Sequence, residues 1–253
     1  MDQFKHFILY FFGALGLFSL WAVTANAQQG LGRFDLDTVR QNRPVATKEI
    51  THASGTKVWL FRLPGGACRK EDCHSDRERS ELIQNQPDNK EGRRYLYTFS
   101  VFIPNSVPDV TPTNLIIWQL KPQGSGKPSV TIEVVHNQIR FVLHNPNALQ
   151  TNKMAPLKPI VIKTVTSSAR GRWLDFELDA LWARGANGHL TFRLNGTVVA
   201  QHHGRNIDDN STKQRVRFGL YRSFISRYMK WAAVGELPLQ TVYFANITRR
   251  RIR

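Results

Sequence analysis

The 253-residue chain is poor in cysteine and in acidic residues, and both shortages narrow what it can be. For its two cysteines, Cys68 and Cys73, a metal site is disfavoured, because the chain has no other cysteine and the nearby His74 alone does not complete a set of ligands. Asp and Glu number 19 against 35 Lys and Arg, which gives a formal net charge of +16. This charge favours a polyanionic partner, such as nucleic acid, an anionic membrane or an acidic polysaccharide.

The sequence also lacks internal repeats, low-complexity segments and any sustained helical periodicity. Short runs of alternating apolar and polar residues recur instead, and Gly, Pro and Asn separate them. The runs are residues 57–63, 94–103, 114–121, 129–135, 138–144, 173–182, 189–195, 215–221 and 241–250. So many strands without intervening helices predict an all-β fold, an antiparallel two-sheet jelly-roll sandwich of the concanavalin type. One of its sheets is expected to form a concave substrate groove, because alternate side chains of each strand point to the same face.

The first 27 residues have the pattern of a secretory signal peptide. Lys5 and His6 precede an apolar run of 17 residues (7–23), and residues 24–27, TANA, end in a small-x-small cleavage pattern. The alternative is a membrane anchor, for which the run is slightly short. We expect cleavage after Ala27, one mature domain of residues 28–253, and a secreted or periplasmic protein with no remaining membrane segment. Export argues against nucleic acid and favours acidic polysaccharide, and it permits a disulfide between Cys68 and Cys73.

The stretch RERSEL, residues 77–82, concentrates charge just after that predicted disulfide. In a strand, Arg77, Arg79 and Glu81 share one face. Guanidinium groups bind carboxylates in bidentate fashion, and Glu81 could hold an arginine in place for that purpose. The alternative is a surface ladder of ion pairs, which would stabilise the fold little.

Two further strands carry polar side chains where an apolar strand is otherwise expected. In NLIIWQLK (114–121), alternation puts Gln119 and Lys121 on one face together with Ile117. In RVRFGLYRS (215–223), Gly219 and Tyr221 share a face, and Gly219 leaves a gap in which a ligand could approach the backbone. Each of these residues, taken alone, is also compatible with a structural place in the core or at its rim.

Four motifs in order carry a resemblance: RSEL (79–82), WQLK (118–121), FGLYRS (218–223) and VYFANI (242–247). Their order and spacing, together with residues 171–200, resemble the jelly-roll polysaccharide lyases. The layout is similar to the glucuronan lyase and heparin lyase I families and, more distantly, to alginate lyases. The resemblance spans about residues 50–250 and implies cleavage of a uronic-acid polymer by β-elimination.

The resemblance implies roles for individual residues. Tyr221 matches the catalytic tyrosine, which is the acid and also a candidate base, and Gln119 matches the glutamine that helps neutralise the substrate carboxylate. Arg79 is expected to bind the uronate, with Glu81 holding it. His74 resembles a histidine near this strand in glucuronan lyases and is the other candidate base.

Substrate contacts are also expected from Arg77, Lys121, Arg217 and Arg222. Lys121 departs from the alginate lyase pattern, which has histidine at this position. A lysine of ordinary pKa donates to a carboxylate but is a poor base, so alginate is disfavoured as the substrate.

Further histidines and basic residues have weaker claims. His136 and His144 are reserve candidates for the groove, of which His144 shares a face with Arg140. Arg227 and Lys230, in a predicted loop (223–231), could extend the binding site for an anionic chain.

Two other functions fit the same fold. A glycoside hydrolase would use a pair of acids from Asp175, Glu177 and Asp179 on one strand, although these acids are expected on a solvated outer face. A non-catalytic carbohydrate-binding module would use Tyr221 and Gln119 for binding alone. No cofactor or metal is indicated, although such folds accommodate a structural calcium ion, and a monomer is expected.

Overall fold

The computed structural model describes residues 34–36, 46–51, 55–68, 70–85, 89–122, 127–144, 160–165, 168–207 and 213–252. The predicted signal peptide, residues 1–27, lies outside this part of the chain. Among the described residues, no helix has the length and apolarity needed to cross a membrane.

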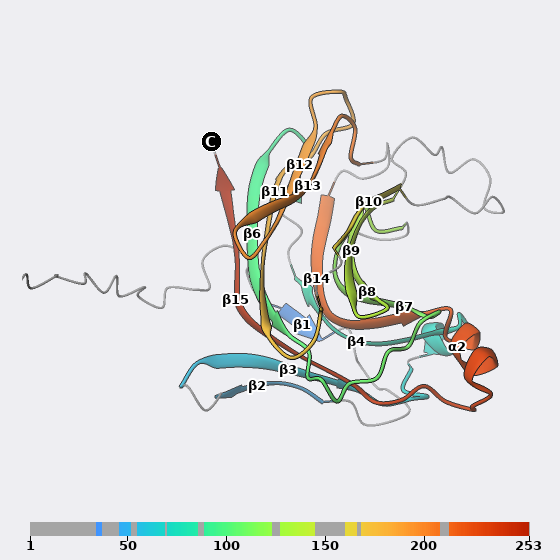
Figure 1. The fold of residues 1–253 in the computed structure, drawn as a ribbon. Helices are drawn as coiled ribbons and strands as arrows, with labels where there is room; N and C mark the ends of the chain where they lie inside the picture. Colours follow the sequence, from blue (N-terminus) through green and yellow to red (C-terminus); the bar gives the residue numbers. More distant parts are fainter. Residues whose placement is uncertain are drawn as a thin grey trace, which may run out of the picture.

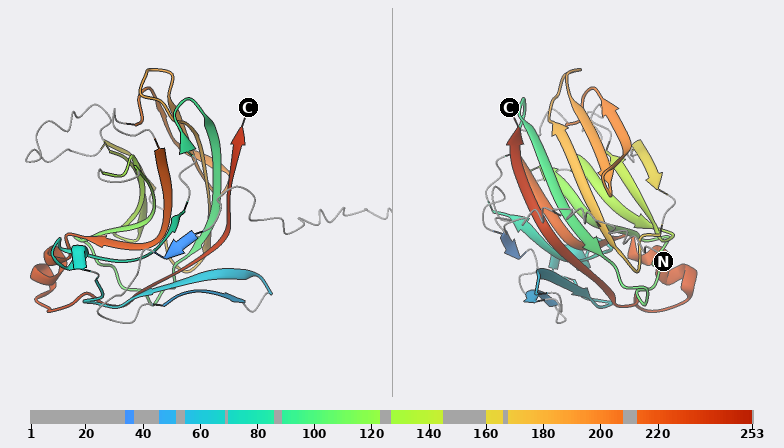
Figure 2. Two further views of the ribbon diagram at one scale, coloured as in Figure 1. Left: turned by 180° about the vertical axis from the view of Figure 1, so that it is seen from behind. Right: turned by 60° about the vertical axis from the view of Figure 1, so that its left-hand side comes forward.

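Two antiparallel sheets make up the fold, as predicted (Figure 1). One sheet, called the curved sheet below, bends strongly along its strands (Figures 1 and 2). Its order is β1 (Phe34–Leu36), β4 (Arg77–Gln84), β14 (Lys213–Ser223), β7 (Asn114–Pro122), β8 (Val130–Val135), β9 (Gln138–Leu143) and β10 (Ile160–Val165), with β5 (Asn89–Lys90) paired to β14. The second sheet has the order β13 (Thr197–His203), β12 (His189–Leu194), β11 (Trp173–Leu181), β6 (Arg94–Phe102), β15 (Gln240–Ile252), β3 (Lys57–Leu63) and β2 (Ala46–Thr51).

Aromatic side chains from both sheets fill the space between them. Phe99 of β6 stacks on Trp118 of β7 with ring centroids 5.8 Å apart, and on Phe176 of β11 at 5.0 Å. Phe61 of β3 packs edge-on against Phe218 of β14 at 5.7 Å. Burying each such ring contributes about 1.5–3 kcal/mol, which holds the apolar faces of these strands toward the core. Gln119 of β7 and Thr131 of β8, which lie opposite each other between core residues, belong to the other face of the curved sheet.

In the part of the chain that the structure describes, two short helices interrupt the strands. α1 (Lys70–Cys73) precedes β4, and α2 (Ile225–Ala232) follows β14. The prediction of a loop over 223–231 was therefore wrong. Ile225, Tyr228 and Met229 pack against the core at helical spacing. This pattern lasts only eight residues, which is too short to be distinguished as periodic in the sequence.

A register shift in the middle of the curved sheet changes which residues face away from the core. Between β14 and β7 the shift falls between Phe218 and Tyr221, and Ile116 lies opposite Tyr221. Ile117 belongs to the core, so the prediction that it shares the face of Gln119 was wrong. A β-bulge adds one residue to a strand and thus reverses the alternation on one side of it.

Gly219 occupies this irregular segment with φ of +134°, a conformation that favours glycine. A Cβ atom at this position would lie 2.3 Å from the carbonyl oxygen of Ser80 and 2.8 Å from the Phe61 ring. The space where a side chain would point is therefore filled by the protein itself. The prediction that Gly219 leaves a gap for a ligand was wrong. β14 can pack this closely on β4 and β3 only because residue 219 has no side chain.

Candidate functional site

Strand pairing brings the sequence-distant motifs together on the curved sheet. Arg79 of β4 lies opposite Tyr221 of β14, and Glu81 lies opposite Gly219. On the other side of β14, Arg217 lies opposite Gln119 of β7. These pairings place Arg79, Glu81, Gln119 and Tyr221 in one cluster.

Arg79 is held by the carboxylate of Asp72, for which the sequence pattern predicts no role. Its Nε donates to Asp72 Oδ2 at 2.6 Å and its Nη2 donates to Asp72 Oδ1 at 2.7 Å, a bidentate pair. Both residues are buried, with Asp72 only 2% exposed. The Arg79 guanidinium carbon lies 4.6 Å from the centroid of the Tyr221 ring. The ion pair therefore fixes a cation against the phenol.

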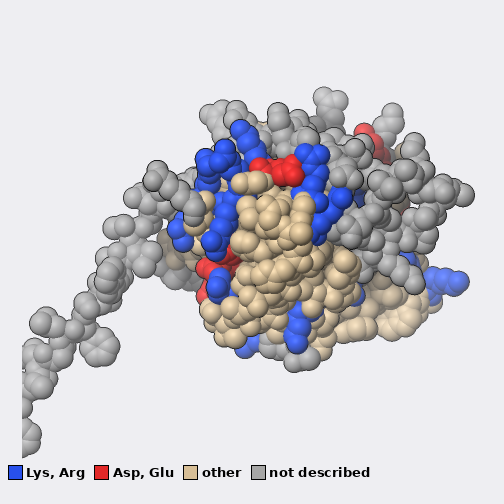
Figure 3. Space-filling view, turned by 90° about the horizontal axis from the view of Figure 1, so that it is seen from above, with Lys and Arg blue, Asp and Glu red and all other residues tan. Residues whose placement is uncertain are grey.

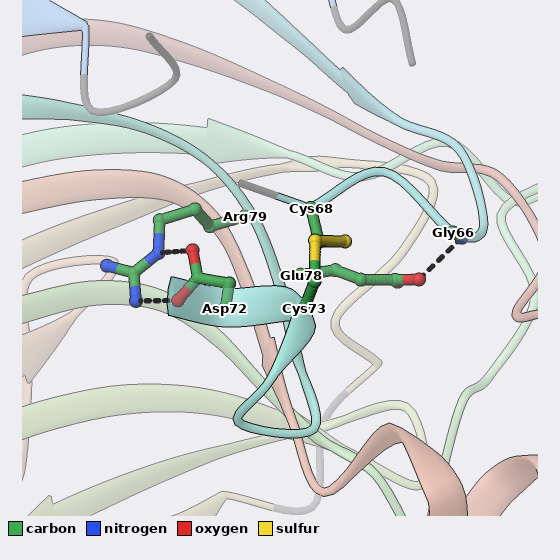
Figure 4. The surroundings of a disulfide bond; sticks show 6 residues. All are labelled: Gly66, Cys68, Asp72, Cys73, Glu78 and Arg79. Atoms are coloured by element: carbon green, nitrogen blue, oxygen red, sulfur yellow. Dashed lines mark hydrogen bonds and ion pairs between the residues drawn. A yellow bond between two sulfur atoms is a disulfide. The ribbon is translucent and has the colours of Figure 1, made fainter. Parts of the chain in front are cut away.

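The disulfide explains why Asp72 is where it is. Cys68 and Cys73 are bonded, with their Cα atoms 5.2 Å apart, and Cys73 is the last residue of α1. Figure 4 shows the disulfide on one side of the α1 ribbon and Asp72 extending toward Arg79 from it. A carboxylate beside a predicted disulfide, in CRKEDC, was the available sequence signal for this contact.

Glu81 and Gln119 continue the buried network. Gln119 Nε2 donates to Glu81 Oε1 at 2.6 Å, and Arg79 Nη1 lies 3.5 Å from Glu81 Oε2. Glu81 is fully buried and Gln119 is 2% exposed. A primary amide has two N–H donors and a carbonyl acceptor, and the bond to Glu81 uses one of the donors. Glu81 therefore orients the Gln119 amide while its second N–H can donate to another group.

Tyr221 is half-buried in this network. Burial raises the pKa of its phenol above the ordinary value, and the charges of Glu81 and Asp72 act in the same direction. Arg79 and Arg77 oppose the rise in pKa, because a positive charge favours the phenolate. The phenol is thus protonated at neutral pH.

Basic side chains border the cluster along the strands. Arg217 lies opposite Gln119, and Arg215 lies opposite Lys121, one alternation further along. All three of these basic residues are half-buried, whereas Arg77, opposite Ser223 at the other end of the pairing, is exposed. Figure 3, a view from above, shows Lys and Arg side chains on both sides of a largely uncharged surface, with an acidic patch between two of the basic groups.

Arg222 does not belong to this face, and its predicted role in substrate binding was wrong. Its side chain is fully buried and forms an ion pair with Glu78. It also donates to the carbonyl oxygens of Pro238 and Pro64, both at 2.8 Å. Burial lowers the pKa of Arg222 to about 10. Arg222 is adjacent to Tyr221 in the strand, so its side chain points to the opposite face of the sheet. There it binds the segments that contain Pro64 and Pro238.

The candidate histidines lie in different places. His74 is exposed in the turn between α1 and β4, next to the disulfide. His136 is exposed, 3.5 Å from Asp109. His144 Nε2 lies 3.1 Å from Thr131 Oγ1, and Thr131 lies opposite Gln119. Burial lowers the pKa of His144.

The acids considered for a hydrolase lie in the second sheet, on β11. Asp175 accepts a hydrogen bond from Ser100 at 2.6 Å, and Asp179 accepts two from Arg94 at 2.8 and 2.6 Å. They are therefore separated from the Tyr221 cluster by the core. Within the described ranges, no group of three His, Cys, Asp or Glu residues could hold a metal ion.

Comparison with known proteins identifies the family of the chain. A family model described as "Polysaccharide lyase" matches residues 18–248, so the chain belongs to the polysaccharide lyase family and is a lyase. No curated protein matches the chain.

Solved structures share the fold at low sequence identity. The endo-beta-1,4-glucuronan lyase from the fungus Trichoderma reesei is 18% identical with a TM-score of 0.63, and the match covers 85% of this chain and 90% of that one. Alginate lyase A1-II', a member of polysaccharide lyase family 7, is 14% identical with a TM-score of 0.55, covering 80% and 82%. The alginate lyase AlgAT5 is 11% identical with a TM-score of 0.53, covering 81% and 82%. These similarities confirm the jelly-roll fold.

Proposed function

We propose that this lyase cleaves a uronic-acid-containing polysaccharide by β-elimination on the groove side of the curved sheet. The observation that carries the proposal is the buried network of Asp72, Arg79, Glu81 and Gln119, which holds a cation and an amide beside the Tyr221 phenol. The names of the structural neighbours, glucuronan lyase and alginate lyase, point to the same class of anionic substrate. The net charge of +16 favours capture of such a polymer.

The first requirement of the reaction is to make the proton at C5 of the uronate removable. That proton is weakly acidic while the adjacent carboxylate keeps its full charge. In our proposal the second N–H of Gln119 donates to this carboxylate, and Arg217 and Lys121 add positive charge from neighbouring positions. Donors placed before the substrate arrives stabilise the developing negative charge without reorganisation.

The second requirement is an acid and a base on the same sugar. We assign Tyr221 as the acid, because its raised pKa keeps the phenol protonated. As the C4–O4 bond breaks and a C4–C5 double bond forms, the phenol proton passes to O4. His74 is our choice for the base that takes the C5 proton, since the disulfide and Asp72 anchor the turn that carries it. The alternative is that Tyr221 serves as both base and acid, in which case its phenolate form takes the C5 proton and the phenol so formed gives that proton to O4.

Asp72 and Arg79 act in this proposal as positioning residues. The bidentate ion pair leaves Arg79 few donors for a substrate, and the guanidinium lies over the Tyr221 ring instead. Their contribution is thus to the orientation and pKa of the phenol. This differs from the direct uronate contact that the resemblance implied for Arg79.

The test is near-ultraviolet absorbance of the purified protein mixed with glucuronan, alginate, heparin and hyaluronan in turn. β-Elimination creates a conjugated double bond at the new non-reducing end, whereas hydrolysis creates only a new reducing end. We expect absorbance to rise with one uronate polymer and to stay flat in Tyr221→Phe. Loss of activity in His74→Ala would support a histidine base, and retention would assign both proton transfers to Tyr221. New reducing ends without absorbance would overturn the proposal.

We also propose that the protein is exported, because residues 1–27 have the composition of a signal peptide. The check is the N-terminal residue of the protein recovered from its producing cells. An N-terminus at Gln28 would support export, and an intact Met1 would contradict it.

A further inference from the structure

Helix α2 begins two residues after the end of β14, the strand that carries Tyr221. One face of the helix packs against the core through Ile225, Tyr228 and Met229. The other face points to solvent, and its Trp231 side chain is 72% exposed. Figures 1 and 2 place this helix beyond the end of β14, at the rim of the curved sheet.

The exposed face combines aromatic rings with positive charge. We call Phe224, Arg227, Lys230 and Trp231 the α2 platform. Lys230 and Trp231 stand three and four positions after Arg227, so each is a neighbour of Arg227 on the helix surface. The Arg227 guanidinium carbon lies 4.1 Å from the centroid of the Phe224 ring, and the Trp231 ring lies 5.8 Å from that of Tyr228. Large apolar side chains exposed together, with charges around them, are typical of binding surfaces.

Phe224 is strained as well as exposed. It has φ of 60° and ψ of 46°, the left-handed region in which a bulky side chain is unfavourable, and 47% of its surface is accessible. Its side chain makes no capping hydrogen bond to the helix. Asn or Gly would suit this conformation better. Stability therefore does not explain why a phenylalanine stands here, and strain of this kind points to function.

The α2 platform is firmly connected to the site. Asp76 accepts the N–H of Phe224 on its carbonyl at 3.0 Å, and its carboxylate accepts from Ser226 N at 2.8 Å and Ser226 Oγ at 2.7 Å. Asp76 belongs to the same turn as His74. Thr113 Oγ1 donates to the carbonyl of Phe224 at 3.2 Å. A platform held this way loses little freedom when a ligand binds.

We infer that the α2 platform is a second binding surface for the acidic polysaccharide, which takes sugar units of the chain as they leave the Tyr221 cluster. This inference rests on the proposed function. Arg227 and Lys230 match the uronate carboxylates in charge, and the exposed Trp231 and Phe224 rings offer flat apolar surfaces to the C–H faces of sugars. Because the α2 platform directly follows β14, a polysaccharide bound at the Tyr221 cluster is the ligand nearest to it.

The test compares a long polymer with short uronate oligosaccharides that fill only the Tyr221 cluster. For Trp231→Ala we expect kcat/KM on the polymer to fall roughly tenfold, through KM, with no change on the oligosaccharides. The matched control is Trp173→Ala, which removes a 36% exposed tryptophan from β11 of the second sheet. It should leave kcat/KM unchanged on both the polymer and the oligosaccharides. Arg227→Gln with Lys230→Gln should act as Trp231→Ala does and should weaken the salt dependence of KM. Their control is Lys48→Gln with Arg62→Gln, two exposed cations of the second sheet.

Equal losses on polymer and oligosaccharide, or none on either, would overturn the inference. The inference would also be overturned if Trp231→Ala left polymer kinetics unchanged but abolished binding to vesicles of phosphatidylcholine and phosphatidylserine, or abolished dimerisation measured by sedimentation. If the wild type forms no unsaturated product from any polymer, the proposed function fails. The α2 platform is then judged by polymer binding in calorimetry, where weaker binding by Trp231→Ala supports it and equal binding refutes it.

Discussion

Replacing Gly219 by alanine tests how the fold holds the catalytic strand. The new Cβ atom would lie 2.3 Å from the Ser80 carbonyl oxygen and 2.8 Å from two atoms of the Phe61 ring. The carbonyl is paired backbone of β4 and cannot rotate aside, and Phe61 is fully buried. Backbone strain at φ of +134° contributes about 1–3 kcal/mol, and overpacking a core contributes a similar amount. We expect Gly219→Ala to lower the free energy of unfolding by about 4 kcal/mol.

The assay is thermal and urea unfolding of the purified variant and wild type. For a domain of this size, such a loss lowers Tm by roughly 10 °C. Gly196→Ala is the matched control, because Gly196 has φ of +78° with nothing within 4 Å of its added Cβ. It isolates backbone strain and should lose about 1 kcal/mol. Equal losses in the two variants would refute the packing argument, and a Gly219→Ala variant of normal stability would refute both parts of it.

Three further predictions concern the site and its support. Glu78→Ala leaves the buried Arg222 without its ion-pair partner and should lower unfolding free energy by about 3–5 kcal/mol, measured by urea titration; a loss below about 1 kcal/mol would contradict the ion pair's importance. Asp72→Ala releases Arg79 from the Tyr221 ring and should lower kcat roughly tenfold with little change in KM, while Asp72→Glu recovers part of it. An equal fall in both variants through KM would instead indicate substrate binding. The acid must be protonated and the pKa of Tyr221 is raised, so on the alkaline side of the profile kcat should fall only above pH 10.0, the ordinary pKa of the phenol. A kcat–pH profile of folded enzyme whose alkaline fall begins below pH 10.0 would exclude Tyr221 as the acid.

The strands could be predicted from the sequence, and their pairing could not. Period-2 alternation marks a strand such as 173–182 locally, because its apolar face is buried everywhere along its length. Alternation does not indicate which strands are neighbours in the sheet. β4 and β14, for example, pair although they are far apart in the sequence. It also fails at the register shift that moves Ile117 into the core. That shift depends on contacts with two neighbouring strands, which no local pattern records.

The site was predictable to the extent that it follows strand alternation and family resemblance. Both placed Arg79, Glu81, Gln119 and Tyr221 on one face, and the structure brings these four together. Their catalytic roles remain predictions. Assigning Arg222 to the substrate contradicted alternation itself, which already put it on the face opposite to Tyr221.

Asp72 was missed because its position depends on a short helix rather than on a strand. Its direction toward Arg79 follows from α1, which the bond between Cys68 and Cys73 ties down and which lies against β4. A helix of four residues is too short to show a periodic pattern in the sequence.

The pairing of β14 between β4 and β7 also has a consequence for how the chain acquires activity. Arg79 and Gln119 are synthesised long before Tyr221, and the strand that joins their neighbourhoods is the last to be added to the curved sheet. Contacts between such distant segments form late in folding, because a long loop must close before they stabilise anything. A nascent or truncated chain that ends before residue 213 therefore has the amide and the ion pair but lacks β14, and with it the Tyr221 acid and the continuity of the curved sheet. The enzyme can cut a polysaccharide only after nearly all of it has been made and folded.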